Sequence, residues 1–174
     1  MKFFLKTGLF FIFMVFLVPN LAMGQFFDAE NINVGKKAPD FTLKTLAGKD
    51  VTLTKFRDNK SAIVFFWATW CPHCREAMKE LNQQSAHWEE KGIRLILIDL
   101  GEDPEDVRHY VEQHKIKSEV LLDIDSSLAE SYGIIGVPTF YFLDKNGTIQ
   151  AVEHELPKNY EEILFGKDVH NVGK

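Results

Sequence analysis

Two long apolar runs separated by an amphipathic segment limit the folds open to this chain. Ala62–Trp67 and Ile93–Leu100 are nearly continuous apolar stretches, as expected of strands buried on both faces of a sheet. Between them, residues 72–91 carry apolar side chains at helical spacing: Ala77, Met78, Leu81 and Trp88. A strand, a helix and a second buried strand predict a parallel βαβ unit.

The remaining pattern extends this unit at both ends. Residues 41–45 and 51–54 predict an N-terminal β-hairpin. Asp103-Pro104 predicts a helix start, and the helix is expected to run to Lys115, followed by a strand at 119–122 and a brief helix ending at Gly133. A second hairpin is predicted from 137–143 and 148–152, followed by a helix at 157–166. We predict an α/β fold of three layers, with a central mixed sheet and a single domain at residues 34–166.

The first 24 residues have the layout of a secretory signal peptide. Lys2 and Lys6 precede the apolar run Gly8–Val18, and small residues stand before a cut at Gln25. The run is short for a spanning helix, although an uncleaved membrane anchor is the alternative. We expect export to the periplasm or another extracytoplasmic space, with a polar tail at 167–174. The net charge of −5 argues against a nucleic-acid partner.

The only two cysteines, Cys71 and Cys74, stand three positions apart in Trp-Cys-Pro-His-Cys. A disulfide between them closes almost no loop, so it would stabilise the fold little. A zinc site needs about four ligands, and no second cysteine pair or paired-histidine motif is present. The sequence therefore favours a redox role over structural and zinc roles. We predict no metal and no cofactor.

The cysteine motif lies where the first buried strand gives way to a helix. Cys71 is expected at the helix N-terminus with Pro72 in the first turn, where the helix dipole favours a thiolate. Cys71 would then attack a partner disulfide, and Cys74 would resolve the mixed disulfide. His73 is predicted to stabilise the Cys71 thiolate and make the disulfide more oxidising; alternatively, it is a solvated turn residue.

Pro138, in Gly136-Val-Pro-Thr139, follows a short helix and opens a strand. This placement suits a cis peptide bond that would expose the Val137 backbone to an extended substrate beside the disulfide. An ordinary proline at a strand entry is the alternative. We expect Trp70, Pro72, Val137 and Thr139 to contact the substrate.

Two segments, FFWATWCPHC and LAESYGIIGVPTFYFLDKNG, resemble thioredoxin-fold proteins over most of the chain after residue 24. The opening Val34–Leu43 and the extra helix and strand between Asp103 and Leu122 resemble the extracytoplasmic TlpA/ResA/CcmG-like group. This resemblance implies that Cys71 attacks, Cys74 resolves, Trp70 flanks them and Pro138 is a cis-proline facing the disulfide. It also implies oxidised protein partners, often apocytochrome c thiols, and a membrane-bound reductant.

The sequence departs from these relatives at three places. Phe65 stands where many thioredoxins carry a buried acid, and Ala77 stands where reductases of apocytochromes often carry Glu. Glu76 and Glu80 are candidate bases for Cys74. The Pro-His pair within the motif is that of the oxidant DsbA.

The sequence therefore leaves four functions open. An extracytoplasmic reductase is favoured, and a dithiol oxidase or isomerase is the main alternative. A thiol peroxidase is suggested by the Gly-x-x-Ala-Pro-Asp-Phe opening, but Thr69 stands one position too close to the cysteine. A binding module that retains idle cysteines is the fourth.

Overall fold

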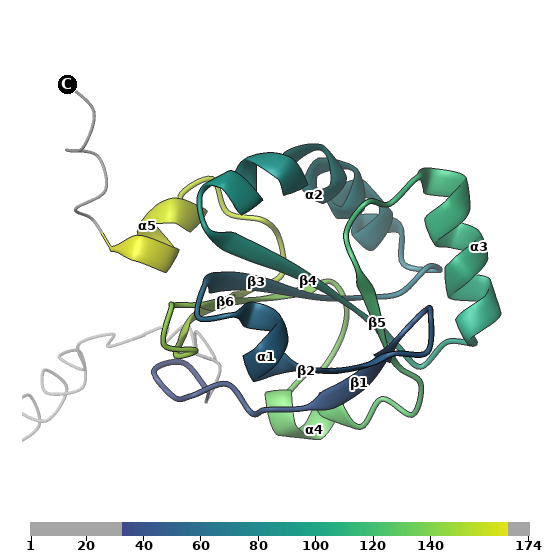
Figure 1. Ribbon diagram of the computed structural model, residues 1–174, viewed down its shortest axis with the longest axis horizontal. Coiled ribbons are helices and arrows are strands. Elements are labelled where there is room, and N and C mark those ends of the chain that lie inside the picture. Colours follow the sequence, from purple (N-terminus) through teal and green to yellow (C-terminus); the bar gives the residue numbers. More distant parts are fainter. Residues whose placement is uncertain (1–32, 167–174) are drawn as a thin grey trace, which may run out of the picture.

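A seven-stranded mixed sheet forms the middle layer of the protein (Figure 1). The structure is a computed structural model that describes residues 33–166. The strands lie in the order β2-β1-β5-β4-β3-β6-β7. Their bounds are β1 Thr42–Thr45, β2 Asp50–Thr52, β3 Ser61–Trp67, β4 Ile93–Leu100, β5 Val120–Asp123, β6 Thr139–Leu143 and β7 Ile149–Glu153. Strands β3, β4 and β5 are parallel, whereas β1 and β6 join them in antiparallel pairs.

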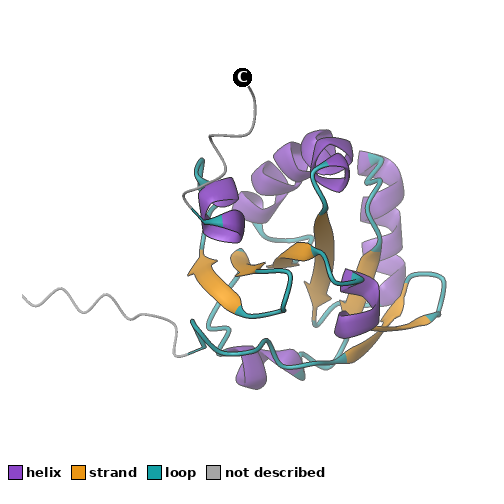
Figure 2. Cartoon of the chain, turned by 60° about the vertical axis from the view of Figure 1, so that its left-hand side comes forward, coloured by secondary structure: helices purple, strands orange, loops and turns teal. Residues whose placement is uncertain are grey.

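Helices cover both faces of this sheet (Figures 1 and 2). One face packs against α2 (Pro72–Glu90), α3 (Pro104–His114) and α5 (Tyr160–Phe165). The other packs against α1 (Leu53–Arg57) and α4 (Leu128–Tyr132). Alternate residues of β3 enter the two cores, Phe65 and Trp67 on the α2 side and Val64 and Phe66 on the other. The predicted three-layer α/β architecture with a mixed sheet is confirmed.

The βαβ unit agrees with the sequence pattern in detail. All seven residues of β3 are buried, and β4 pairs with it in register from Ser61 opposite Ile93 to Trp67 opposite Asp99. Asp103 caps α3 by accepting a hydrogen bond from the Glu105 N–H at 2.8 Å, as its position before Pro104 predicts.

Three predicted boundaries differ from the structure by two residues or more. The sequence predicts residues 53 and 54 as the end of a strand, but they begin the short helix α1. The Leu53 side chain is buried in the core on the face of the sheet that α1 and α4 cover. The strand after Pro138 begins at Thr139 rather than Val137, and the last helix begins at Tyr160 rather than residue 157. The predicted signal segment and polar tail lie outside the described residues.

Helix α1 also supplies a buried guanidinium. Arg57 is 6% exposed, and its Nη1 donates hydrogen bonds at 2.7 Å to the carbonyl oxygens of Lys60 and Lys145. The second of these carbonyls belongs to the β6–β7 turn, so Arg57 ties this turn to the end of α1. Within residues 33–166, no helix combines the length and the apolarity needed to cross a membrane.

Candidate active site

Cys71 lies at the amino end of α2, in the short connection that follows the end of β3 at Trp67. It is the N-cap residue of the helix, and its Sγ accepts a hydrogen bond from the Cys74 N–H at 3.2 Å. Pro72 occupies the first turn, where its missing N–H costs nothing. The unpaired amides and the positive end of the helix dipole meet at this sulfur, which favours a negative charge there. The predicted placement of the cysteine is confirmed.

Cys71 and Cys74 form a disulfide, with their Cα atoms 5.2 Å apart. Cys74 is completely buried, whereas Cys71 keeps 3% of its surface exposed. Cys71 is therefore the more accessible cysteine of the pair. The neighbouring Trp70 is 65% exposed, so a large apolar ring lies on the surface beside the disulfide.

A second loop faces the disulfide. The Val137–Pro138 peptide bond is cis, as predicted. The carbonyl oxygen of Val137 lies 3.6 Å from the Cys71 Sγ. Thr139 begins β6 beside β3, and its hydroxyl donates a hydrogen bond to the Gly136 carbonyl at 2.7 Å, which ties down the start of this loop. Segments 66 residues apart in the sequence thus meet at the two sulfurs.

His73 projects from the first turn of α2 into solvent. Its side chain is 82% exposed, and its Nδ1 lies 3.7 Å from the Glu76 carboxylate. Both residues line a hollow of about 500 Å³ next to the cis-proline, together with Ala77, Glu80, Pro138, His154, Glu155 and Leu156. The candidate bases Glu76 and Glu80 thus border this hollow.

His154 was not identified from the sequence. Its Nδ1 lies 3.0 Å from the Pro138 carbonyl oxygen and 3.4 Å from the Thr139 hydroxyl. The imidazole therefore contacts the cis-proline loop and lines the same hollow as Pro138. No sequence signal marks it, because it follows β7 and lies 16 residues from Pro138.

A buried acid close to the cysteine loop was also missed. Asp99, at the end of β4, is 1% exposed, and burial together with the hydrogen bond and negative charge of Glu102 raises its pKa to about 9. A signal was present in the sequence, because Asp99 is the single charged residue in the run Leu-Ile-Leu-Ile-Asp-Leu. The acid expected of thioredoxins at position 65 is thus absent, and an acid stands on the neighbouring strand instead.

Among residues 33–166, no group of three or more His, Cys, Asp or Glu side chains is arranged to hold a metal ion. His109 and His114 both lie on α3, and the two cysteines are joined to each other.

Known proteins match this chain in sequence and in fold. It is 34% identical over 148 residues to "Thiol-disulfide oxidoreductase ResA" of Bacillus thuringiensis subsp. konkukian, covering 84% of this chain and 85% of that protein. A thiol:disulfide interchange protein from Bacteroides sp. superposes with a TM-score of 0.69 at 27% identity, covering 81% of this chain and 93% of the other. A thioredoxin-family thiol:disulfide interchange protein from Chlorobium tepidum gives 0.62 at 27% identity, over 74% and 92%.

With the disulfide at the amino end of α2, these likenesses define the class: the chain is a thioredoxin-fold thiol–disulfide oxidoreductase. It belongs to the AhpC/TSA family, whose sequence profile matches residues 34–152. Its relatives are ResA-like oxidoreductases, as the cysteine motif and the opening segment indicate.

Proposed function

We propose that this chain is an exported reductase of protein disulfides, with Cys71 as the attacking thiol. The observation that carries the proposal is the placement of Cys71. It caps α2, faces the cis-proline loop and is the one cysteine of the pair that solvent reaches. A thiol at a helix N-terminus has a lowered pKa, and the thiolate is the nucleophile in disulfide exchange.

The reaction proceeds in two successive thiol–disulfide exchanges. In the reduced protein, the Cys71 thiolate attacks one sulfur of a partner disulfide, and the other partner sulfur leaves as a thiolate. Cys74 then loses its proton to a base and attacks the Cys71 Sγ, which releases the second partner sulfur. The partner gains two electrons and two protons, and the Cys71–Cys74 disulfide re-forms. Glu76 and Glu80, which line the adjoining hollow, are the nearby candidates for the base.

The surrounding residues are assigned to substrate binding. The backbone of Val137, before the cis-proline Pro138, pairs with an extended segment of the partner, as in strand addition. Thr139 holds the turn that presents this backbone. Trp70 and Pro72, exposed on the other side of the disulfide, contact apolar side chains of the partner.

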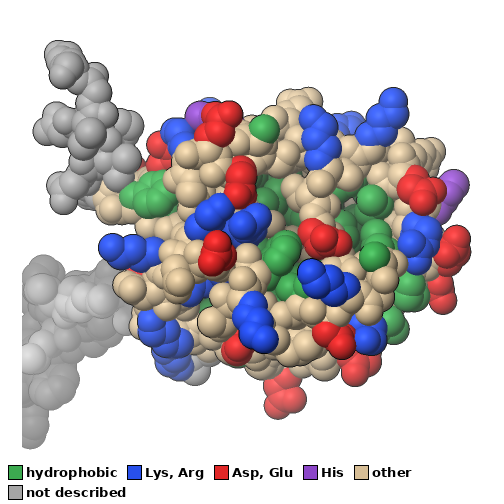
Figure 3. Space-filling view, viewed as in Figure 1, with side chains coloured by type: hydrophobic (Ala, Val, Ile, Leu, Met, Phe, Trp, Pro, Cys, Tyr) green, Lys and Arg blue, Asp and Glu red, His purple; other side chains and the backbone are tan. Residues whose placement is uncertain are grey.

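The partners and the location follow from the sequence and the relatives. Residues 1–24 act as an export signal, residues 34–166 form the working domain, and a membrane-bound donor returns electrons to the disulfide. The resemblance of the sequence to the TlpA/ResA/CcmG-like group implies a role in preparing the thiols of apocytochrome c, and the relatives named thiol-disulfide oxidoreductase agree with the redox part of this role. The face in Figure 3 mixes basic and acidic side chains without a continuous basic area, which suits a protein partner better than a nucleic acid.

A dithiol oxidase is the second candidate because of His73. Its imidazole lies in the first turn of α2, two residues from Cys71, where a positive charge would stabilise the thiolate and hence the reduced form. The Glu76 carboxylate 3.7 Å from His73 opposes this effect, because it offsets the imidazolium charge. The exposure of His73 weakens it further through solvent screening.

The equilibrium of the Cys71–Cys74 pair with glutathione separates the two candidates. A reductase is expected to have a potential near that of thioredoxin, about −270 mV, and an oxidase one near that of DsbA, about −120 mV. We expect the first value, and we expect His73→Ala to change the equilibrium constant no more than about twofold. His109→Ala, a substitution of an exposed histidine on α3, is the matched control. A potential close to that of DsbA would overturn the reductase assignment.

A further inference from the structure

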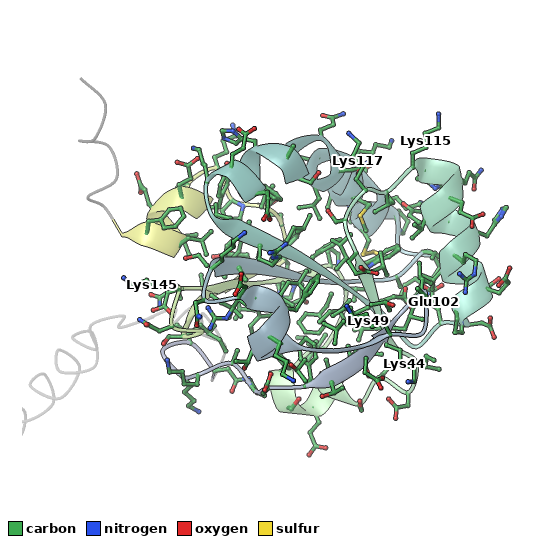
Figure 4. All side chains as sticks on the ribbon, in the orientation of Figure 1. Lys44, Lys49, Glu102, Lys115, Lys117 and Lys145 are labelled. Carbon is green, nitrogen blue, oxygen red and sulfur yellow. A yellow bond between two sulfur atoms is a disulfide. The ribbon has the colours of Figure 1, made fainter. Side chains whose placement is uncertain are left out.

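Two carboxyl groups that take no part in the exchange reaction lie next to the Thr69–Cys71 loop, which carries the attacking cysteine. Glu102 lies in the connection from β4 to α3, where Figure 4 labels it. Its Oε2 accepts a hydrogen bond from the Thr69 N–H at 2.5 Å, and its Oε1 accepts one from the Thr69 hydroxyl at 2.6 Å. Both oxygens of one side chain thus hold one residue, which stands two positions before Cys71.

Asp99 supports Glu102 from inside the fold. It lies opposite Trp67 in the β3–β4 pair and is 1% exposed, and its buried Oδ2 finds no donor among the described residues, which leaves this oxygen to carry a proton toward the neighbouring Glu102 carboxyl group. Two carboxyl groups in contact cannot both be ionised without strong repulsion, so the pair keeps one proton between them. The buried Asp99 holds this proton at neutral pH, because its pKa is raised to about 9.

This arrangement makes Glu102 an acceptor of three hydrogen bonds. Asp99 donates one through its proton, and Thr69 donates two. Bonds to an ionised acceptor are about twice as strong as neutral ones. Within the part of the chain that the structure describes, Glu102 forms no ion pair with Lys or Arg, so these donors are what compensates its charge.

The loop that Glu102 holds presents the two groups with which a partner would first make contact. Trp70 is mostly exposed, and Cys71 caps α2. The backbone of Cys71 donates a hydrogen bond to the Ala68 carbonyl at 3.3 Å and accepts one from the Arg75 N–H of α2 at 3.1 Å. The two hydrogen bonds from Thr69 to Glu102 are therefore the side-chain anchor of the segment that leads to the sulfur.

We propose that Glu102 and Asp99 are positioning residues for disulfide exchange: Glu102 fixes the Thr69–Cys71 loop, and the proton of Asp99 fixes Glu102. This inference deepens the proposed function and rests on it, because the loop is useful only if Cys71 attacks a partner. A loose loop lowers the fraction of time in which the sulfur is aligned for attack.

The test compares four variants in the reduction of insulin disulfides, with dithiothreitol as the electron source. Glu102→Ala and Asp99→Ala are expected to lower kcat/KM by about tenfold or more. Asp99→Asn is expected to stay within about threefold of the wild type, because its carboxamide still donates an N–H to Glu102. Glu105→Ala, which removes an exposed acid at the start of α3, is the control and leaves the activity unchanged.

The amide proton of Thr69 gives a readout that does not depend on turnover. Bound to a carboxylate oxygen, it is expected downfield in the NMR spectrum of the wild type and of Asp99→Asn. It should move upfield and lose protection from hydrogen exchange in Glu102→Ala and Asp99→Ala. If the wild type fails to reduce insulin, the proposed function fails, while this spectrum still tests the anchor.

Two results would overturn the inference. One is full activity in Glu102→Ala with the Thr69 amide proton moved, since the anchor would then be irrelevant to exchange. The other is equal loss in Asp99→Asn and Asp99→Ala, since the donated hydrogen bond would not be what matters. If these variants do not fold, Thr69→Ser and Thr69→Ala take their place, because Thr69 is only half-buried. Thr69→Ser is expected to keep both hydrogen bonds to Glu102 and the activity. Thr69→Ala is expected to lose the hydroxyl hydrogen bond and, with it, activity.

Discussion

Replacing Asp99 by Asn should change how the stability of this protein depends on pH. Asp99 ordinarily would titrate near 3.8, but in the folded chain its pKa is raised to about 9 by burial and by Glu102. Between these values the folded state keeps a proton that the unfolded state releases. The free energy of unfolding therefore falls as the pH rises, by about 1.4 kcal/mol per pH unit for one proton.

The substitution removes this dependence and little else. Asn has the shape of a protonated Asp and can donate an N–H to Glu102. Relative to the wild type, Asp99→Asn should gain about 2.7 kcal/mol of stability between pH 6 and pH 8. The lowered pKa values of Glu89, Asp125 and Glu161 affect stability only in acid, where these carboxyls become protonated, so they leave this window undisturbed.

Urea unfolding of the oxidised proteins at pH 6, 7 and 8 measures this difference. With a slope of about 1–3 kcal/mol per molar urea, the midpoint of the variant should move by roughly 1–3 M relative to the wild type across the range. Glu105→Gln, at an exposed carboxyl, should run parallel to the wild type. Parallel curves for Asp99→Asn and the wild type would show that Asp99 is ionised in the folded chain, and the reasoning about the shared proton would fail.

Two stability predictions concern the framework. Arg57→Met should lower the free energy of unfolding by about 2–3 kcal/mol, because the carbonyl oxygens that Arg57 binds lose their buried donor. Lys55→Met, on the exposed side of the same helix, should lower it by under about 0.5 kcal/mol, and thermal unfolding measures both changes. Gly101→Ala should be more destabilising than Gly48→Ala. Both glycines have φ near +75° (74° and 78°), but a Cβ at Gly101 would lie 2.9 Å from the Ser126 Oγ and one at Gly48 would meet nothing within 4 Å. Equal losses in the two glycine variants would mean that the Ser126 side chain moves aside without cost.

The sequence predicts most of the sheet because burial leaves a direct pattern. The nearly continuous apolar runs of β3 and β4 and the helical spacing between them predict a parallel βαβ unit. The turn residues Asp144–Gly147 likewise specify the last hairpin. Helix α1 escapes this reasoning because it is only five residues long, and its first residue, Leu53, continues the alternation of apolar residues that starts at Val51 in the preceding strand.

The candidate site also contains residues that a local sequence pattern predicts and residues that it does not. The cysteine pair and Pro138 belong to short motifs in which neighbouring residues carry the signal. The Glu102–Thr69 anchor joins residues 33 positions apart, and His154 reaches Pro138 across a hairpin. Contacts of this kind depend on tertiary packing, so no residue spacing in a single sequence predicts them.

Trapping the mixed disulfide tests the identity of the attacking thiol most directly. Reduced Cys74→Ser and Cys71→Ser proteins are each mixed with insulin, quenched with acid and analysed on non-reducing gels with peptide mapping. The geometry predicts that Cys74→Ser accumulates an adduct through Cys71, since the resolving sulfur is missing, and that Cys71→Ser forms none, since Cys74 is fully buried. An adduct on Cys74, or none in Cys74→Ser while the wild type turns over, would contradict the assignment.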